Sequence, residues 1–281
     1  GKDIPPELSI CVPEHIHVGL KDVNLPVDIL LATVKNCEYL ACYMFLKDPF
    51  GCCFDRLGHV LFGEIGEGHG KKMKVALMRY TRGSVNPECS LSTVKDAVLL
   101  LRAKVVIYVG TCIGLKPEET KLGDVVISAK VTTHGSNVIR SGGNEFTDEK
   151  HHMSRHFLDV IRGAIEVWKA PLRDPGTRDV KVHCDVQFLS DIELTSAKWQ
   201  HDKLIKSYPK ATAIEMEGEG LFASEFDHQI GWLVLKGISE YADSTVCSSE
   251  KWNTFASVMA ASVVVKILSD PDVFQEWSHY Q

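Results

Sequence analysis

Several classes of protein are excluded by features that this chain lacks. It has no Cys-x-x-Cys pair and no Cys/His set with zinc-finger spacing, so a metal-bound fold is not indicated. Its nine cysteines are an odd and scattered set, which favours reduced thiols and a cytoplasmic protein. The formal net charge of −6 opposes nucleic acid as a partner, because phosphate backbones are bound by basic surfaces.

Membrane features are also missing from the sequence. Pro5, Pro6 and Glu7 interrupt any apolar stretch at the start, so no signal peptide is expected. No apolar run has the length that a bilayer requires, so no membrane partner is expected.

What the chain does have is enough apolar sequence for a buried core, at 281 residues and 44% hydrophobic. Short apolar runs predict strands, and the amphipathic runs between them predict helices. Continuous apolar strands that alternate with helices are typical of a parallel sheet covered on both faces. The predicted strands are 28–32, 74–78, 105–109, 124–128 and 232–235, and the predicted helices are 93–101, 158–168, 198–207 and 252–268, with another beginning within 33–40.

The chain is interpreted as one domain, 25–281, preceded by an N-terminal extension, 1–24. Ligands of such α/β sheets bind beyond the carboxyl ends of the strands. The loops after residues 32, 109 and 235 are therefore where chemistry is expected. Two irregular stretches, 134–152 and 170–179, are long enough to be loops over a pocket, although surface loops of this length are commoner.

The string Ala-Ile-Glu-Met-Glu-Gly-Glu-Gly at 213–220 is the most informative motif. In an extended stretch, Glu215 and Glu217 share one face while Met216 points the other way. A carboxylate in a pocket can accept two hydrogen bonds at once, which suits the 2′ and 3′ hydroxyls of ribose. The alternative is a solvated acidic turn before a helix.

Three other segments carry candidate polar residues. After the central predicted strand, Gly110 permits close approach of a ligand to the backbone and Thr111 adds a hydroxyl, unless the segment is only a tight strand-to-helix turn. After the last strand, Glu240 and Asp243 are candidate general acids, unless Asp243 or Ser244 only caps a helix and Glu240 is solvated. Glu38 lies in the first turns of a predicted helix, where a charge at the positive helix end is the alternative.

Together these blocks resemble the nucleoside phosphorylase-I superfamily, which includes purine and uridine phosphorylases and the methylthioadenosine/S-adenosylhomocysteine nucleosidases. The similarity runs from about residue 28 to about residue 268. It implies a three-layer phosphorylase-like α/β fold, with a mixed, mainly parallel central sheet flanked by helices. It also implies no metal or organic cofactor and at least a homodimer. The matching blocks, in order, are Glu38, 110–117, 122–126, 215–217 and 238–243.

The resemblance also implies roles for individual residues. Glu38 matches the carboxylate that orients and deprotonates the attacking water, and Glu240 matches the acid that protonates purine N7. Met216 and Glu217 match the pair that holds the ribose. Thr111 and Cys112 match residues that line the sugar and nucleophile site, and Gln187 and Phe188 lie where the family contacts the base. The remaining candidates are Glu215 and Ser239 as substrate-binding residues and Asp243 as a replacement acid.

Two departures from the family pattern leave alternatives open. The family acid is usually Asp, whereas Glu240 is one methylene longer, which keeps open an inactive nucleotide-binding module. Hexameric bacterial phosphorylases carry a Gly-Asp-Pro-Gly-Arg loop after the first strand and an Arg where this chain has Tyr108. Without those cationic donors for phosphate, water is favoured as the nucleophile over phosphorolysis.

The stretch 237–244 with Lys251-Trp252 looks closest to nucleosidase-like domains fused to death-type and other immune-signalling modules. Several of these are effectors that hydrolyse ATP to adenine and ribose triphosphate. The sequence therefore predicts a purine nucleosidase that acts on an adenine nucleoside or nucleotide, ATP included. The irregular start permits a place in a larger signalling chain, and the candidate phosphate contacts are Arg79, Arg82 and Lys251.

Overall fold

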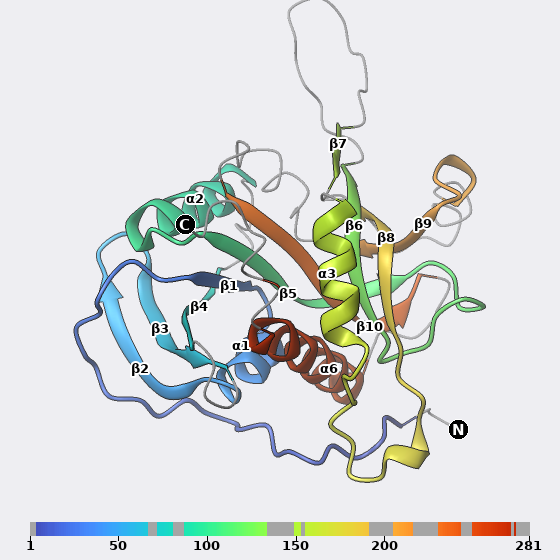
Figure 1. The fold of residues 1–281 in the computed structure, drawn as a ribbon, viewed down its shortest axis with the longest axis horizontal. Helices are drawn as coiled ribbons and strands as arrows, with labels where there is room; N and C mark the ends of the chain where they lie inside the picture. The colour runs from blue at the N-terminus through green and yellow to red at the C-terminus, as the bar shows by residue number, and fades with distance from the viewer. Residues whose placement is uncertain are drawn as a thin grey trace, which may run out of the picture.

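The computed structural model describes residues 4–66, 72–80, 87–133, 149–152, 155–190, 205–215, 230–242, 249–270 and 273. Within them the chain alternates strands and helices around one large sheet (Figure 1). The strands are β1 (Ile29–Thr33), β2 (Lys47–Phe54), β3 (Gly58–Ile65), β4 (Met73–Arg79), β5 (Val105–Gly114), β6 (Val125–Thr133), β7 (Glu149–His152), β8 (Val182–Ser190), β9 (Ala211–Glu215) and β10 (Gly231–Tyr241). The helices are α1 (Asn36–Tyr43), α2 (Pro87–Leu101), α3 (Arg155–Ile165), α6 (Glu250–Ser269) and the short 3₁₀ helix η1 (Pro175–Thr177).

In these residues the ten-stranded sheet has the order β10-β6-β8-β9-β5-β1-β4-β3-β2, with β7 on β6 and a further pairing of β10 with β5. Strands β5, β10, β6, β8 and β9 thus form a closed hydrogen-bonded circuit, from which β1, β4, β3 and β2 extend as an open sheet. In Figure 1 the open part lies on the left and β6, β8 and β9 on the right. The central strands β4, β1, β5 and β10 are mutually parallel, and antiparallel pairings surround them. The predicted mixed α/β sheet with a parallel centre is confirmed.

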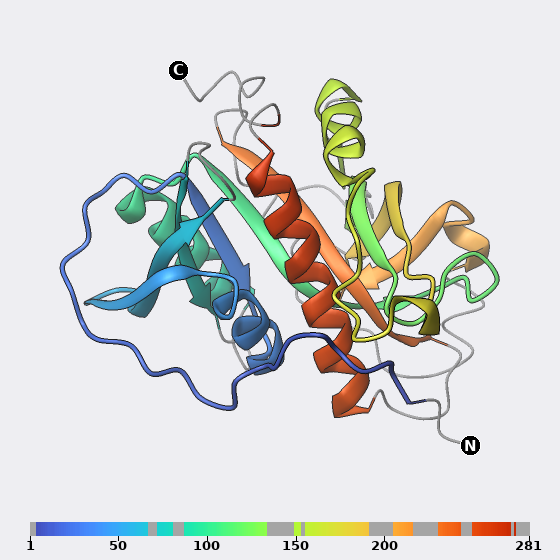
Figure 2. The same ribbon diagram turned by 60° about the horizontal axis from the view of Figure 1, so that its bottom comes forward.

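The core lies on both faces of the central strands, as the continuous apolar runs predict. All five residues of β1 are buried. Ile29 and Leu31 pack into the cluster that contains the apolar residues of α6, whereas Leu30 and Ala32 pack into the cluster that contains those of α2. Figure 2 shows α6 crossing one face of the sheet, with α1 beside it. Strand β1 therefore ends in a fully enclosed position, directly before α1.

Several predicted boundaries need correction. The strand predicted at 105–109 continues through Gly110 to Gly114, because its later residues pair with β10 and β9, so no tight strand-to-helix turn follows it. The helix predicted at 93–101 begins earlier, because α2 starts at Pro87. The stretch predicted as the loop 134–152 ends in β7, which pairs with β6, while 134–148 lies outside the described residues. The predicted helix 198–207 falls mostly outside them as well.

Helix α6 corrects the expectation that no segment is long and apolar enough to cross a membrane. By length and composition alone it meets that test, and it is the one helix of the described residues that does. However, 72% of its apolar stretch is buried inside the protein, as in the core helix of a globular domain. Its Ala and Val residues face β10, β5 and α1, so its apolar character is explained by packing.

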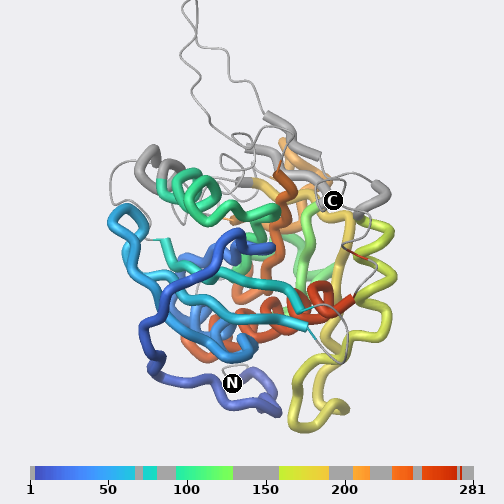
Figure 3. The backbone as a smooth tube through the Cα atoms, turned by 60° about the vertical axis from the view of Figure 1, so that its left-hand side comes forward, coloured from blue at the N-terminus to red at the C-terminus, as the bar shows by residue number. Residues whose placement is uncertain are grey.

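The residues before β1 form an extended arm. In Figure 3 this blue segment runs across the outside of the fold before it enters β1. Isolated bridges attach it at Leu8, which pairs with Leu172, and at Leu20, which pairs with Gly51. Apolar residues of the arm, among them Ile10 and Val12, pack against the α6 side of the core. The arm is thus held by a few pairings and by apolar burial, without regular structure of its own.

The close approach of α6 to β10 predicts the effect of a single methyl group. A Cβ on Gly237 would lie 2.2 Å from the backbone oxygen of Ala256, and neither backbone can move away cheaply. We expect Gly237→Ala to lower the free energy of unfolding by about 1–3 kcal/mol, as overpacking does. Chemical denaturation followed by circular dichroism measures this loss.

The matched control is Gly163→Ala in α3. Nothing lies within 4 Å of a Cβ at Gly163, and Ala is the better helix former there. This variant should gain roughly 0.5–1 kcal/mol. Equal effects of the two substitutions would contradict the proposed contact between β10 and α6.

Candidate active site

Three neighbouring parallel strands bring most of the described candidate residues to one edge of the sheet. Strand β5 pairs with β1 on one side and with β10 on the other. Glu38 follows the carboxyl end of β1 in the first turn of α1, Thr111 lies in the last half of β5, and Glu240 lies at the end of β10. This is the edge where open α/β sheets bind ligands, as the sequence predicted.

The Glu38 carboxylate at this edge is fully hydrogen-bonded. It is 1% exposed, and its two oxygens accept four hydrogen bonds. Oε2 accepts from the backbone N–H groups of Val34 and Lys35 at 3.0 and 2.9 Å. Oε1 accepts from the backbone N–H of Thr111 at 2.8 Å and from its hydroxyl at 3.1 Å. A carboxylate has about four acceptor positions, so the protein uses all of them.

Gly110 is needed to make room for this carboxylate. A Cβ at that position would lie 2.5 Å from Oε1 of Glu38 and 2.6 Å from its carboxyl carbon. The sequence interpretation assigned the small residue to close approach of a ligand. In the structure, the space beside Gly110 is occupied by Glu38 itself.

Lys35 is a residue at this site that the sequence analysis missed. It is the N-cap of α1, and its Nζ donates a hydrogen bond of 2.7 Å to the Thr111 hydroxyl. That hydroxyl in turn contacts Glu38, so an ammonium, a hydroxyl and a carboxylate stand in a row. The one sequence signal was a Lys at a position where helices prefer Ser, Thr, Asp or Asn.

Lys236 is a second missed residue. It lies on β10 opposite Gly110 of β5, and it is 1% exposed, which is rare for a lysine. Burial raises the pKa of the Cys42 thiol in α1, the Glu38 carboxylate adds to the rise, and the Lys236 ammonium opposes it. Gly110, with which Lys236 pairs, is also the residue beside which the Glu38 carboxylate lies, so both charged residues belong to this stretch of β5. Composition alone gives no signal that distinguishes this lysine from a surface one.

The end of β10 is positioned by the start of the sequence block 122–126, Leu-Gly-Asp. The backbone N–H of Gly123 donates to the oxygen of Ile238 at 2.7 Å, and the N–H of Ile238 donates to the oxygen of Asp124 at 2.8 Å. Gly123 has a φ of +89°, and a Cβ there would meet the Phe255 ring at 2.4 Å. The block thus fixes the residue immediately before Ser239.

A bulge follows at Ser239, where the register between β10 and β5 shifts. Bulges re-aim side chains near active sites. Ser239 is 2% exposed, whereas Glu240 opposite Ile113 is only partly buried. Tyr241 is anchored by its hydroxyl, which donates to the Thr120 oxygen at 2.6 Å. The candidate acid is therefore on a well-fixed backbone but less enclosed than a buried acid would be.

The structure describes only some of the residues predicted to contact the sugar and the base. Glu215 ends β9 and is 1% exposed, and Met216, Glu217 and Asp243 lie outside the described residues. Cys112 is buried on β5. On β8, Gln187 is partly buried, while Phe188 is 0% exposed within the hydrophobic core.

The candidate phosphate contacts lie in different places. Arg79 ends β4 beside β1, donates from Nη1 to Oδ1 of Asn36 at 3.0 Å, and lies 5.9 Å from the Tyr39 ring centroid. It is exposed at the same edge as Glu38. Arg82 lies outside the described residues.

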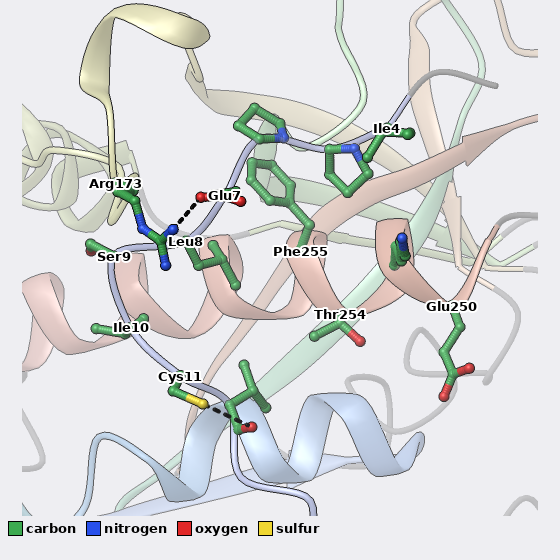
Figure 4. A pocket seen from close by; sticks show the side chains of 14 residues that line it. Ile4, Glu7, Leu8, Ser9, Ile10, Cys11, Arg173, Glu250, Thr254 and Phe255 are labelled. Atoms are coloured by element: carbon green, nitrogen blue, oxygen red, sulfur yellow. Dashed lines mark hydrogen bonds and ion pairs between the residues drawn. The ribbon is translucent and has the colours of Figure 1, made fainter. Parts of the chain in front are cut away.

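Lys251 lies in the first turn of α6 and lines a cavity of about 750 Å³ between that helix and the N-terminal arm. Figure 4 shows Phe255 and Thr254 on one side of this cavity, Ile4 and Leu8 on the other, and Arg173 near Glu7. Its lining is mostly apolar and contains none of Glu38, Thr111 and Glu240. The cavity is a separate feature from the Glu38 edge. Within the described ranges, no three His, Cys, Asp or Glu side chains gather as metal ligands.

Comparison with known proteins identifies the fold. No protein-family model matches the chain. A 5′-methylthioadenosine/S-adenosylhomocysteine nucleosidase of Streptococcus pneumoniae, solved with a transition-state inhibitor, has a TM-score of 0.68 at 15% identity, covering 86% of this chain and 98% of that one. The corresponding enzyme of Colwellia psychrerythraea, solved with adenine, has a TM-score of 0.67 at 16% identity, covering 87% and 95%. The resemblance in sequence is thus confirmed at the level of the fold: the chain has the fold of the nucleosidases in the nucleoside phosphorylase-I superfamily.

One curated protein is similar to this chain in sequence. The death domain-containing ATP nucleosidase of Amphimedon queenslandica is 24% identical in an alignment 220 residues long, which covers 73% of this chain and 41% of that protein. The chain therefore spans less than half the length of this curated relative.

The bonding of Glu38 predicts a structural cost for its removal. Glu38→Ala leaves buried N–H groups and the Thr111 hydroxyl without their acceptor, and each such group costs about 1–3 kcal/mol. We expect the free energy of unfolding to fall by at least about 2 kcal/mol, measured by chemical denaturation. Glu119→Ala, which removes an exposed partner of Lys116, should change it by less than about 0.5 kcal/mol. A Glu38 variant as stable as the Glu119 variant would contradict the bonding described.

Proposed function

We propose that this protein is a purine nucleosidase that hydrolyses the N-glycosidic bond of an adenine nucleoside or nucleotide, including ATP. The observation that carries the proposal is the Glu38 carboxylate, held beside Thr111 at the carboxyl edge of the parallel strands. The nucleosidase fold and the ATP nucleosidase relative support it.

In this proposal the glycosidic bond breaks through a sugar with oxocarbenium character. Glu240 donates a hydrogen bond or a proton to purine N7, so that the base leaves neutral. Glu38 accepts a proton from the attacking water. Because all four of its acceptor positions are filled by the protein, the water must replace one donor. The Thr111 hydroxyl is the donor that can turn away, since the other three are backbone N–H groups held in the turn between β1 and α1 and in β5.

The sugar is assigned to the end of β9 and the residues that follow it. Glu215 fixes the end of that strand, and Met216 and Glu217 are proposed to hold the ribose hydroxyls. Thr111, Cys112 and Ser239 are proposed to surround the sugar and the nucleophile, and Gln187 and Phe188 remain the proposed base segment. Asp243 is the proposed replacement for Glu240 should the longer side chain not reach N7.

The wider setting belongs to the same proposal. The relative that aligns with this chain carries a death domain, and its length leaves room for other modules. We place this chain in the cytoplasm, as a homo-oligomeric catalytic part of a signalling protein of innate immunity. Its small-molecule partner is the purine nucleotide.

A nucleotide panel tests the activity. ATP, AMP, adenosine and methylthioadenosine are incubated with the protein, with and without inorganic phosphate, and free adenine is measured by chromatography. We expect adenine release from ATP without added phosphate and no sugar 1-phosphate. Glu38→Gln should lose at least roughly 100-fold in rate, the usual contribution of a general base.

The outcomes of that panel separate the competing functions. Turnover that requires phosphate identifies a phosphorylase, and nucleotide binding without adenine release identifies a binding module. Circular dichroism of Glu38→Gln distinguishes lost chemistry from lost folding. Undiminished turnover by a folded Glu38→Gln variant would refute the assignment of the base.

Arg79 provides a test of the phosphate side. It is exposed at the Glu38 edge, so we propose that it contacts the 5′ phosphates. Arg79→Gln should raise KM for ATP roughly tenfold while KM for adenosine stays constant, because only ATP loses a charge-assisted hydrogen bond. Arg162→Gln on α3, which removes another exposed arginine, should change neither. If Arg79→Gln raised KM for adenosine as much as KM for ATP, a contact between Arg79 and the phosphates would be contradicted.

A further inference from the structure

The N-cap of α1 is occupied by a residue that does not favour the helix. Lys35 holds this position, and its side chain makes no capping hydrogen bond to the helix backbone. Helix N-caps prefer Ser, Thr, Asp or Asn, and a cation at the positive end of a helix is unfavourable. A break in a local rule, at a site of proposed chemistry, calls for a reason outside the helix.

That reason is found 76 residues further along the chain. Lys35 Nζ donates to the Thr111 hydroxyl at 2.7 Å, and the hydroxyl contacts Oε1 of Glu38 at 3.1 Å. An ammonium has no acceptor, so the Thr111 oxygen must accept from Lys35. The hydroxyl hydrogen is then free to point at Glu38, which as a carboxylate can only accept. The direction of both hydrogen bonds is therefore fixed by Lys35.

We infer that Lys35 is a positioning residue, which acts through the Thr111 hydroxyl to hold Oε1 of Glu38 ready for the attacking water. This inference rests on the proposed nucleosidase function. While the hydroxyl points at Glu38, no acceptor position is open. When it turns toward water or sugar, Lys35 keeps its oxygen in place, and Oε1 gains one free position without any movement of the backbone.

The test uses the conflict between helix stability and catalysis. Lys35→Ser supplies a preferred N-cap, so the melting temperature should stay constant or rise. The same variant loses the ammonium, so kcat should fall roughly 10- to 100-fold, as for a misplaced catalytic group, with KM for adenosine unchanged. Lys35→Met also removes the ammonium but adds no capping group, so it should show the same loss of kcat. Lys35→Arg should retain part of kcat, because its guanidinium can still donate to Thr111.

Two further comparisons sharpen the result. In a cycle with Thr111→Val, adding Lys35→Met should cause little additional loss of kcat, because the route through the hydroxyl is already gone. Lys72→Ser is the matched control and should keep full activity. Lys72 pairs with Glu64 just before β4 begins, at the edge of the sheet opposite to Glu38.

Each contrary outcome has a clear meaning. If the wild-type protein releases no base from any nucleotide, the proposed function fails and this inference falls with it. If the wild type is active, three results overturn the positioning role alone: an unchanged kcat in Lys35→Ser and Lys35→Met, a loss of kcat matched by a lower melting temperature, or a rise in KM confined to ATP. The last result would make Lys35 a phosphate contact.

Discussion

The hydrogen bonds of one buried carboxylate hold the proposed site together. Glu38 joins the turn after β1, the start of α1 and the backbone of β5 through four donors. A buried charge is tolerated only when it is fully hydrogen-bonded, so these elements must meet in one geometry. Gly110 completes the arrangement, because any side chain there would collide with the carboxylate. The proposed catalytic base and the structural joint are thus the same group.

The second half of the site depends on close backbone packing. Gly237 allows α6 to lie against β10, and Gly123 allows the turn before β6 to pass the Phe255 ring. The reciprocal hydrogen bonds between this turn and Ile238 then fix the bulge that carries Ser239 and leads to Glu240. In this way α6, which contributes no proposed catalytic residue, determines where the candidate acid stands.

The site also shows where local stability and proposed chemistry diverge. Lys35 at an N-cap and Lys236 in the core both oppose ordinary preferences for lysine. Lys35 is linked to Glu38 through the Thr111 hydroxyl, and Lys236 pairs with Gly110, the residue that makes room for the Glu38 carboxylate.

The sequence by itself determined the central strands, α1, the core helix α6 and the order of the motif blocks, because apolar periodicity and local residue patterns encode them. It did not reveal β2, whose Pro49 and Gly51 interrupt the strand pattern, or the true extent of β5, which depends on pairing with β10 and β9. Glu38 was found as a candidate, but its partners were not. Thr111 is 73 residues away, and the roles of Gly110, Lys35 and Lys236 arise only when β1, β5 and β10 lie side by side. Contacts between distant segments are set by tertiary packing, and no local pattern records them.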